Sequence, residues 1–131
     1  IGRMSQTSRG SVGKLGEDLA VRYLTGKGFS IIGRNYRKPW SEIDIIAESS
    51  KGLHFIEVKS VRADFYQGAM YRPEENAHSV KLRRLAKVIE TYLWEKGIGA
   101  DSPWQLDVIA VEIDFSRKTS KIRYIESVSI A

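Results

Sequence analysis

Residues 41–59 have the sequence SEIDIIAESSKGLHFIEVK, in which two apolar segments flank a short polar one. Isoleucine, valine and phenylalanine recur in residues 42–47 and 53–60, as is typical of β-strands. The polar, glycine-containing residues 49–52 between these segments predict a hairpin turn. We therefore expect two antiparallel strands connected by a tight turn.

The register of this hairpin brings two acids together. A turn centred between Ser50 and Lys51 pairs Asp44 with Glu57, Glu42 with Lys59 and Ile46 with Phe55. Because side chains alternate between the faces of a strand, one face should carry Glu42, Asp44, Ile46, Phe55, Glu57 and Lys59. The opposite face should bury Ile43, Ile45, Ile56 and Val58 in a core.

Two directly opposed carboxylates, with Cβ atoms roughly 4.5–5.5 Å apart, repel each other. A divalent cation such as Mg²⁺ removes this cost, since it binds carboxylate oxygens together with water and substrate phosphate. Lys59 should lie about 7 Å along the strand from Glu57, where an ammonium can orient a water molecule or stabilise charge on a phosphoryl group. The sequence thus predicts a metal-dependent phosphodiesterase site with Asp44, Glu57 and Lys59 as catalytic residues. The plainer interpretation is a salt-bridge cluster on a solvated strand.

The rest of the chain predicts an α/β domain. Apolar residues at helical spacing predict helices over residues 11–27 and from residue 76 to before Gly97. Further strands are expected over residues 30–35, 106–113 and 121–128, and loops over residues 36–41 and 61–75. We expect residues 1–10 to form a flexible N-terminus, in which residues 1–3 could be left over from cloning, and residues 11–131 to form one domain.

Composition limits the classes of function. The 131-residue chain has 21 Lys and Arg against 16 Asp and Glu, a net charge of +5, which points to a polyanionic partner: nucleic acid or an acidic membrane surface. It has no cysteine, which excludes disulfides, thiolate catalysis and cysteine zinc sites. With neither a membrane-spanning apolar run nor a secretory signal, we expect a cytoplasmic protein.

Several motifs together resemble the bacterial YraN-like family. They are Gly16-Glu17, Arg34-Asn35-Tyr36-Arg37, EIDIIA at residues 42–47, FIEVK at residues 55–59 and DVI at residues 107–109. The resemblance covers residues 12–111. It departs from the family pattern at Ser41, where glycine is usual, at Gln105-Leu106, where Arg-Phe is usual, and at Arg62, a displaced basic residue.

That family resembles the PD-(D/E)XK nuclease superfamily, which includes Holliday-junction resolvases. The resemblance implies a restriction-endonuclease-like three-layer core, with a mixed central sheet flanked by helices. It also implies a Mg²⁺ or Mn²⁺ cofactor, DNA as partner, including branched DNA, and a homodimer as a candidate assembly. Asp44 and Glu57 match the metal-binding acids, Lys59 matches the catalytic lysine, and Glu17 resembles a first-helix acid that joins the metal. Glu17 fits equally as an acid that stabilises the helix dipole.

Basic and aromatic residues outside this centre are candidates for nucleic-acid binding. They are Arg37, Lys38 and Trp40 in the loop, Arg62, and Lys81, Arg84 and Lys87 on the second helix. The alternatives are a Trp40 packed on the core and a helix face that is simply solvated. We expect His54 at a strand edge and His78 in the first turn of the second helix, and neither histidine suggests a metal site.

Three functions follow from these observations. The first is a Mg²⁺- or Mn²⁺-dependent endonuclease that hydrolyses phosphodiester bonds in DNA. The second is a nucleic-acid-binding protein that keeps the nuclease fold but does not cut. The third is an adaptor that uses its basic face on a membrane surface or a protein. The opposed acids favour the first, because a protein that only binds gains nothing from them.

Overall fold

The computed structural model describes residues 2–65 and 79–129, and the side chains of residues 12–64 and 82–129. Its elements are α1 (Gly2–Gly26), β1 (Ser30–Lys38), β2 (Ser41–Ser49), β3 (Gly52–Arg62), η1 (Ala63–Phe65), α2 (Ser79–Glu95), β4 (Trp104–Asp114) and β5 (Thr119–Ile125). Every helix and strand expected from the sequence is present, although α1 begins at Gly2 and not at residue 11. The flexibility expected of residues 1–10 stays a prediction.

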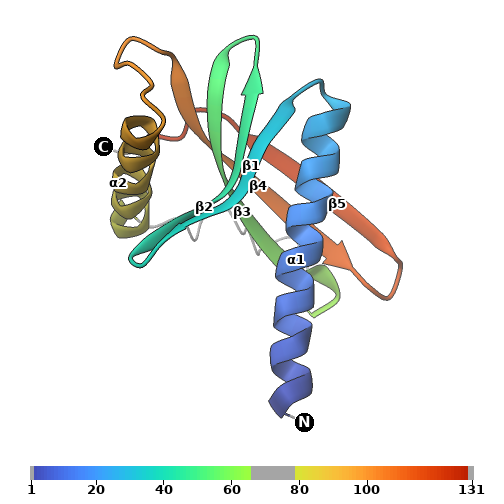
Figure 1. Ribbon diagram of the computed structural model, residues 1–131. Coiled ribbons are helices and arrows are strands. Elements are labelled where there is room, and N and C mark those ends of the chain that lie inside the picture. The colour runs from blue at the N-terminus through green and yellow to red at the C-terminus, as the bar shows by residue number, and fades with distance from the viewer. Residues whose placement is uncertain (1, 66–78, 130–131) are drawn as a thin grey trace.

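The strands form one mixed sheet in the order β1-β2-β3-β4-β5. β3 and β4 are parallel, and the other neighbouring strands are antiparallel. Figure 1 shows α1 against one face of the sheet and α2 against the other. The expected mixed sheet flanked by helices is therefore confirmed.

Each helix covers its own apolar core. The α1 core contains Ala20, Leu24, Ile45, Ala47, Ile56, Ile109, Val111 and Ile113. The α2 core contains Ile43, Ile46, Phe55, Leu82, Leu85, Val88, Ile89, Tyr92 and Leu106. Because both faces of β2, β3 and β4 are buried, these strands are apolar along most of their length, and a charged side chain within them needs a specific explanation.

The expected hairpin register is confirmed where β2 and β3 pair. Ser49 lies opposite Gly52, and the ladder continues through Ile46 opposite Phe55 to Ile45 opposite Ile56, where it ends. Beyond that point β2 pairs only with β1, while β3 runs parallel to β4. Figure 1 shows β2 and β3 diverging below their shared ladder. Asp44 and Glu57 are thus the first residues past the point where the strands part.

The expected assignment of side chains to faces is wrong near Asp44. Ile43 lies in the α2 core, but Ile45 lies in the α1 core, although a regular strand would put both on one face. Ile46 is also buried and does not share an open face with Asp44. The break coincides with Asn35 of β1, which has a left-handed backbone (φ 54°) and lies opposite Asp44, between the pairs Arg34–Ile45 and Tyr36–Ile43. β1 also has a bulge between Ile31 and Gly33.

Helix α1 approaches β3 most closely at Gly16. A Cβ atom on Gly16 would lie 1.8 Å from Ser60 Oγ and 2.8 Å from Ser60 Cβ. Only glycine allows this contact, which brings α1 against β3 at Ser60.

We expect the Gly16→Ala variant to be less stable than wild type by about 1–3 kcal/mol, because overpacking outweighs the gain in helix propensity. Gly13→Ala is the matched control, since nothing lies within 4 Å of a Cβ at Gly13 on the same helix. Urea unfolding should show Gly13→Ala to be neutral or stabilised, and adding Ser60→Gly to Gly16→Ala should restore stability. Equal stability of the two alanine variants would contradict the close packing.

Candidate active site

Asp44 occupies the gap that opens between β2 and β3. Its Oδ2 accepts a hydrogen bond of 2.8 Å from the backbone N–H of Val58. The Asp44 carboxylate therefore takes the place of a backbone carbonyl just past the last pair of the ladder. This bond fixes the Asp44 carboxylate between the two strands. Glu57 directly precedes Val58 on β3.

The pKa of Asp44 is shifted by its burial and by the charge of Glu57. Burial, and then the negative charge of Glu57, raise the pKa of Asp44 to about 8. The Val58 N–H acts in the opposite direction, while a hydrogen bond with Glu57 and the charge of Glu17 raise the pKa further. Glu57 itself is only 6% exposed. A buried acid pair that retains a proton at neutral pH is costly for a purely structural sheet, but a divalent cation can replace that proton.

Lys59 lies beside this pair. Its Nζ is 3.3 Å from Oε2 of Glu57, and its side chain is largely buried. Both residues alternate with Ile56 and Val58, which pack in the α1 core, so they project toward the α2 side with Phe55. The structure thus places an ammonium next to the acid pair.

The expected opposition of Glu42 and Lys59 does not form within the β2–β3 ladder, which ends before those residues. Glu42 instead pairs with Arg37 of β1, where Arg37 Nε lies 3.4 Å from Glu42 Oε1. The register was correct, but the strands separate before it can apply to Glu42.

Glu17 lies near the pair but has other partners. Its Oε1 accepts hydrogen bonds from Arg34 Nη2 (3.4 Å) and Asn35 Nδ2 (3.3 Å), and Arg34 also binds Asp18 at 2.8 Å. Within residues 2–65 and 79–129, no three His, Cys, Asp or Glu side chains are arranged to hold a metal ion. The donor set present at the gap is therefore the two carboxylates of Asp44 and Glu57, which is what Mg²⁺ uses when water and a phosphate complete its shell.

The expected loop over residues 36–41 is wrong for most of its length, because β1 continues to Lys38 and β2 begins at Ser41. The expected nucleic-acid-binding residues at the end of β1 and in the following turn differ in availability. Arg37 is exposed, and Trp40 is 47% exposed, so Trp40 is not packed into a core as its plainer interpretation required. Lys38 is tied to helix α2, because its Nζ lies 2.7 Å from Glu95 Oε2. Arg37 and Trp40 can therefore reach a ligand without breaking a buried contact.

The remaining candidate basic residues lie elsewhere. Arg62 forms an ion pair of 2.9 Å with Asp64 and stacks over the ring of Phe115 at 4.5 Å. Arg84 and Lys87 are exposed on α2, which covers the sheet face that carries Lys59. The side chain of Lys81 and the whole of His78 lie outside the described residues.

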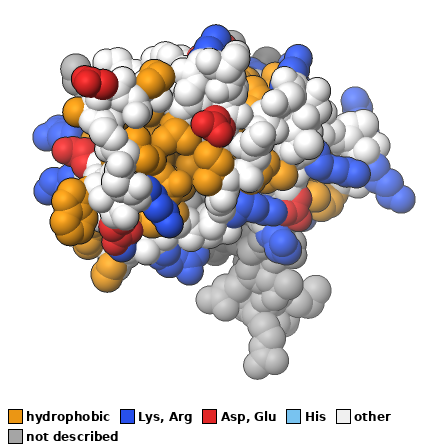
Figure 2. Space-filling view, turned by 45° about the horizontal axis from the view of Figure 1, so that its top comes forward, with side chains coloured by type: hydrophobic (Ala, Val, Ile, Leu, Met, Phe, Trp, Pro, Cys, Tyr) orange, Lys and Arg blue, Asp and Glu red, His pale blue; other side chains and the backbone are white. Residues whose placement is uncertain are grey.

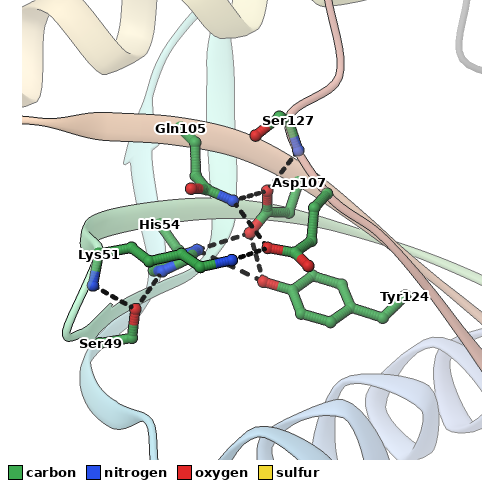
Figure 3. A network of polar contacts seen from close by, with 8 residues as sticks. Ser49, Lys51, His54, Gln105, Asp107, Tyr124 and Ser127 are labelled. Carbon is green, nitrogen blue, oxygen red and sulfur yellow. Dashed lines mark hydrogen bonds and ion pairs between the residues drawn. The ribbon is translucent and has the colours of Figure 1, made fainter.

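A second polar group, around Asp107, was not predicted from the sequence (Figure 3). Asp107 is completely buried and accepts bonds from Tyr124 OH, Gln105 Nε2 (2.8 Å) and the Ser127 N–H (2.9 Å). Its Oδ2 lies 2.7 Å from Nδ1 of His54, whose Nε2 lies 2.7 Å from Ser49 Oγ. His54 is therefore buried, and its expected place at a strand edge is wrong. The single sign of this network in the sequence is an acid between apolar residues, in LDVIAV at residues 106–111.

A hollow on the α2 side has different chemistry. Figure 2 shows hydrophobic side chains gathered on this face with charged side chains around them. A pocket of about 410 Å³ is lined mainly by Ile32, Leu53, Tyr92, Ile98 and Pro103, with Glu48 as its one carboxylate. A lone exposed acid beside apolar walls offers no paired carboxylates, so we place the candidate site at Asp44 and Glu57.

Comparison with known proteins settles the family. A family model described as uncharacterised protein family UPF0102 matches residues 16–111, more than half of the chain. The chain belongs to the UPF0102 family. The expected membership of the YraN-like group is thereby confirmed. All four residues of the candidate site, Glu17, Asp44, Glu57 and Lys59, lie within the matched UPF0102 region.

UPF0102 relatives in distant bacteria match most of the chain. A UPF0102 protein of Campylobacter jejuni is 40% identical over 102 residues, which cover 78% of this chain and 84% of the relative. One of Alkaliphilus oremlandii is 36% identical over 116 residues (88% and 95%). One of Mycolicibacterium vanbaalenii is 33% identical over 122 residues (93% and 96%).

Neither helix that the structure describes combines the length and apolar character needed to cross a lipid bilayer.

Proposed function

We propose that this UPF0102 protein is a metal-dependent nuclease that hydrolyses phosphodiester bonds in DNA. The observation that carries this proposal is the acid pair of Asp44 and Glu57 at the parting of β2 and β3, with Lys59 Nζ 3.3 Å from Glu57. A structural sheet gains nothing from a buried, mutually repelling pair, whereas a cation-binding site requires one. Asp44 followed by Glu57-Val58-Lys59 also supports a restriction-endonuclease-like core of the PD-(D/E)XK kind.

Each residue has a role in this proposal. Asp44 and Glu57 hold Mg²⁺ or Mn²⁺, which when bound polarises a phosphoryl oxygen and lowers the pKa of a bound water molecule. Lys59 supplies a positive charge beside the phosphate, held by its ion pair of 3.3 Å with Glu57. The Val58 N–H keeps the Asp44 carboxylate in the gap, since it donates to Oδ2.

The charge of the protein supports a nucleic-acid substrate. The net charge of +5 favours a polyanionic partner. Arg37 near the end of β1 and Trp40 in the β1–β2 turn are exposed, and they offer a phosphate contact and a surface for base stacking. We propose DNA, including branched DNA, as the substrate, with Arg62, Arg84 and Lys87 as further phosphate contacts. A homodimer is the assembly that we propose for two-strand cleavage.

A second candidate is a nucleic-acid-binding protein that does not cut. One contact favours it: Arg34 and Asn35 hold the Glu17 carboxylate, so the third acid is engaged. In this case the basic surface would bind DNA, while the acid pair would hold a proton and no cation.

Cleavage assays separate the two candidates. Wild type should cut branched or linear DNA with Mn²⁺ or Mg²⁺ but not with EDTA. Glu57→Gln and Lys59→Met should lower the rate by at least about 100-fold, because each removes a charge at the reacting phosphate. Glu48→Gln and Lys121→Met, two exposed positions outside the gap, are the matched controls and should retain the rate. Binding of DNA without cleavage by wild type would support the second candidate. Cleavage that survives both site substitutions would rule out this site.

A further inference from the structure

We propose that Asn35 is the positioning residue of the acid site, which it assembles through its backbone and its side chain separately. This inference deepens the proposed function and rests on it. Neither β2 nor β3 explains why the Asp44 side chain lies in the gap, because both strands are regular where they pair with each other. The cause lies on the neighbouring strand β1.

The backbone of Asn35 has an unusual conformation for a strand residue. Its φ of 54° is left-handed, and it falls across from Asp44, between the pairs Arg34–Ile45 and Tyr36–Ile43. A left-handed residue within a strand reverses the alternation of side chains, as the two successive exposed residues Arg34 and Asn35 show. The same reversal appears across the ladder, where Ile45 faces α1 and Ile43 faces α2. Asp44 sits at this reversal, so its side chain lies between the two faces and can reach the Val58 N–H.

The side chain of Asn35 binds a residue of helix α1. Its Nδ2 donates to Oε1 of Glu17 at 3.3 Å, and Arg34 Nη2 reaches the same oxygen at 3.4 Å. This bond ties Glu17 of α1 to the β1 residue that falls between the two pairs flanking Asp44. Asn35 of β1 therefore acts twice: its backbone directs Asp44 into the gap, and its side chain binds Glu17 of α1.

Asparagine suits both tasks. Its short polar side chain tolerates the left-handed region better than other non-glycine residues, and its amide can donate to a carboxylate. Lys118 and Ser127 are the other non-glycine residues with positive φ in the described chain, and Lys118 (φ 55°) lies in the β4–β5 turn. Lys118 therefore provides a control for backbone strain at a distance from the acids.

Substitutions separate the two tasks. Asn35→Gly retains the left-handed backbone but loses the amide, whereas Asn35→Val disfavours that backbone and also loses the amide. We expect Asn35→Val to weaken binding of Mn²⁺ alone by about 10–100-fold, as is usual when a residue that orients a metal ligand is lost. Asn35→Gly should weaken it less, by up to about 10-fold. Lys118→Val should leave Mn²⁺ affinity at the wild-type value.

A second measurement does not depend on the metal. Amide hydrogen exchange of Val58, followed by NMR without metal, reports whether Asp44 still accepts its N–H. Exchange at Val58 should accelerate at least 10-fold in Asn35→Val but stay slow in Asn35→Gly and Lys118→Val, with the buried ladder residue Ile56 as internal reference. Asn35→Ala, which disfavours the left-handed region less severely, serves if Asn35→Val does not fold.

The outcomes are distinct. Wild-type Val58 protection in both Asn35→Val and Asn35→Ala would overturn the positioning role. An equal loss in Lys118→Val would overturn it too, because strain alone would then explain the effect. If wild type binds no Mn²⁺, the proposed function fails, but Val58 exchange still decides whether Asn35 positions Asp44.

Discussion

The Asp44→Asn variant is expected to be more stable than wild type at pH 8 without metal, by about 3 kcal/mol. Asparagine keeps an oxygen that can accept the Val58 N–H, so the bond that spans the gap is preserved. It removes a carboxyl group that burial and the charge of Glu57 make costly to ionise.

The sign of this effect follows from the pKa of Asp44. The pKa of Asp44 in the folded protein, about 8, lies above the ordinary aspartate value of 3.8. Between those pH values the folded protein therefore holds a proton that the unfolded chain has released. Wild-type stability attributable to Asp44 is therefore full below about pH 4 and falls as pH rises toward 8. The advantage of Asp44→Asn should accordingly vanish near pH 4.

Urea unfolding at pH 4, 6 and 8 with EDTA measures this difference. Added Mn²⁺ should stabilise wild type but not Asp44→Asn, since the variant has lost one of the two proposed ligands. A variant less stable than wild type at pH 8 would show that the acid pair is a structural ion-pair cluster and not a cation site.

The Asp107→Asn variant is expected to lose about 3–5 kcal/mol, although the chemical change is the same as at Asp44. Asp107 is completely buried, and both of its oxygens accept hydrogen bonds, from Gln105, Tyr124 and the Ser127 N–H, with His54 Nδ1 2.7 Å away. An amide would turn one acceptor into a donor, so that Tyr124 and His54 must both reverse their roles in the network or buried polar groups are left unsatisfied.

Urea unfolding at pH 7 compares the two substitutions directly. Tyr124→Phe, which removes one donor and leaves the carboxylate, should cost only about 1 kcal/mol and serves as the graded control. Burial and the hydrogen bond to Asp107 raise the pKa of Tyr124, so its hydroxyl keeps its proton and can donate at pH 7. A loss below about 1 kcal/mol in Asp107→Asn would show that the network of Figure 3 does not anchor the sheet.

The hairpin could be predicted because its determinants are local. The four turn residues and two flanking apolar segments are enough to set which residues of β2 and β3 face each other, and the structure has that register. The predicted opposition of Asp44 and Glu57 falls just past the end of that ladder, where Asp44 binds the Val58 N–H. The lysine was placed beside them by simple alternation along β3, which stays regular.

The orientation of Asp44 could not be predicted, because its cause lies on another strand. The left-handed backbone of Asn35 leaves no mark on the hydrophobic pattern of residues 42–47, yet it divides Ile43 and Ile45 between opposite cores. Glu17 likewise carries no sign of the partners that hold it, since Arg34 and Asn35 lie 17 and 18 residues away.

The Asp107 network was missed for a similar reason. Its partners come from β3, β4, β5 and the segment after β5, and His54 lies 53 residues from Asp107. A single acid among apolar residues can mark either a site or a buried anchor, and only the donors around it decide between them.

The irregularities of β1 also bear on how copies of this protein meet. β1 and β5 are the two open edges of the sheet, and an open edge invites a strand from another molecule. β1 offers no long regular ladder, because the bulge after Ile31 and the left-handed Asn35 interrupt it, and β5 presents the charged Lys121 and Arg123. Association by continuing the sheet from one copy into the next is therefore disfavoured, which protects an apolar, twice-buried sheet against fibrous aggregation.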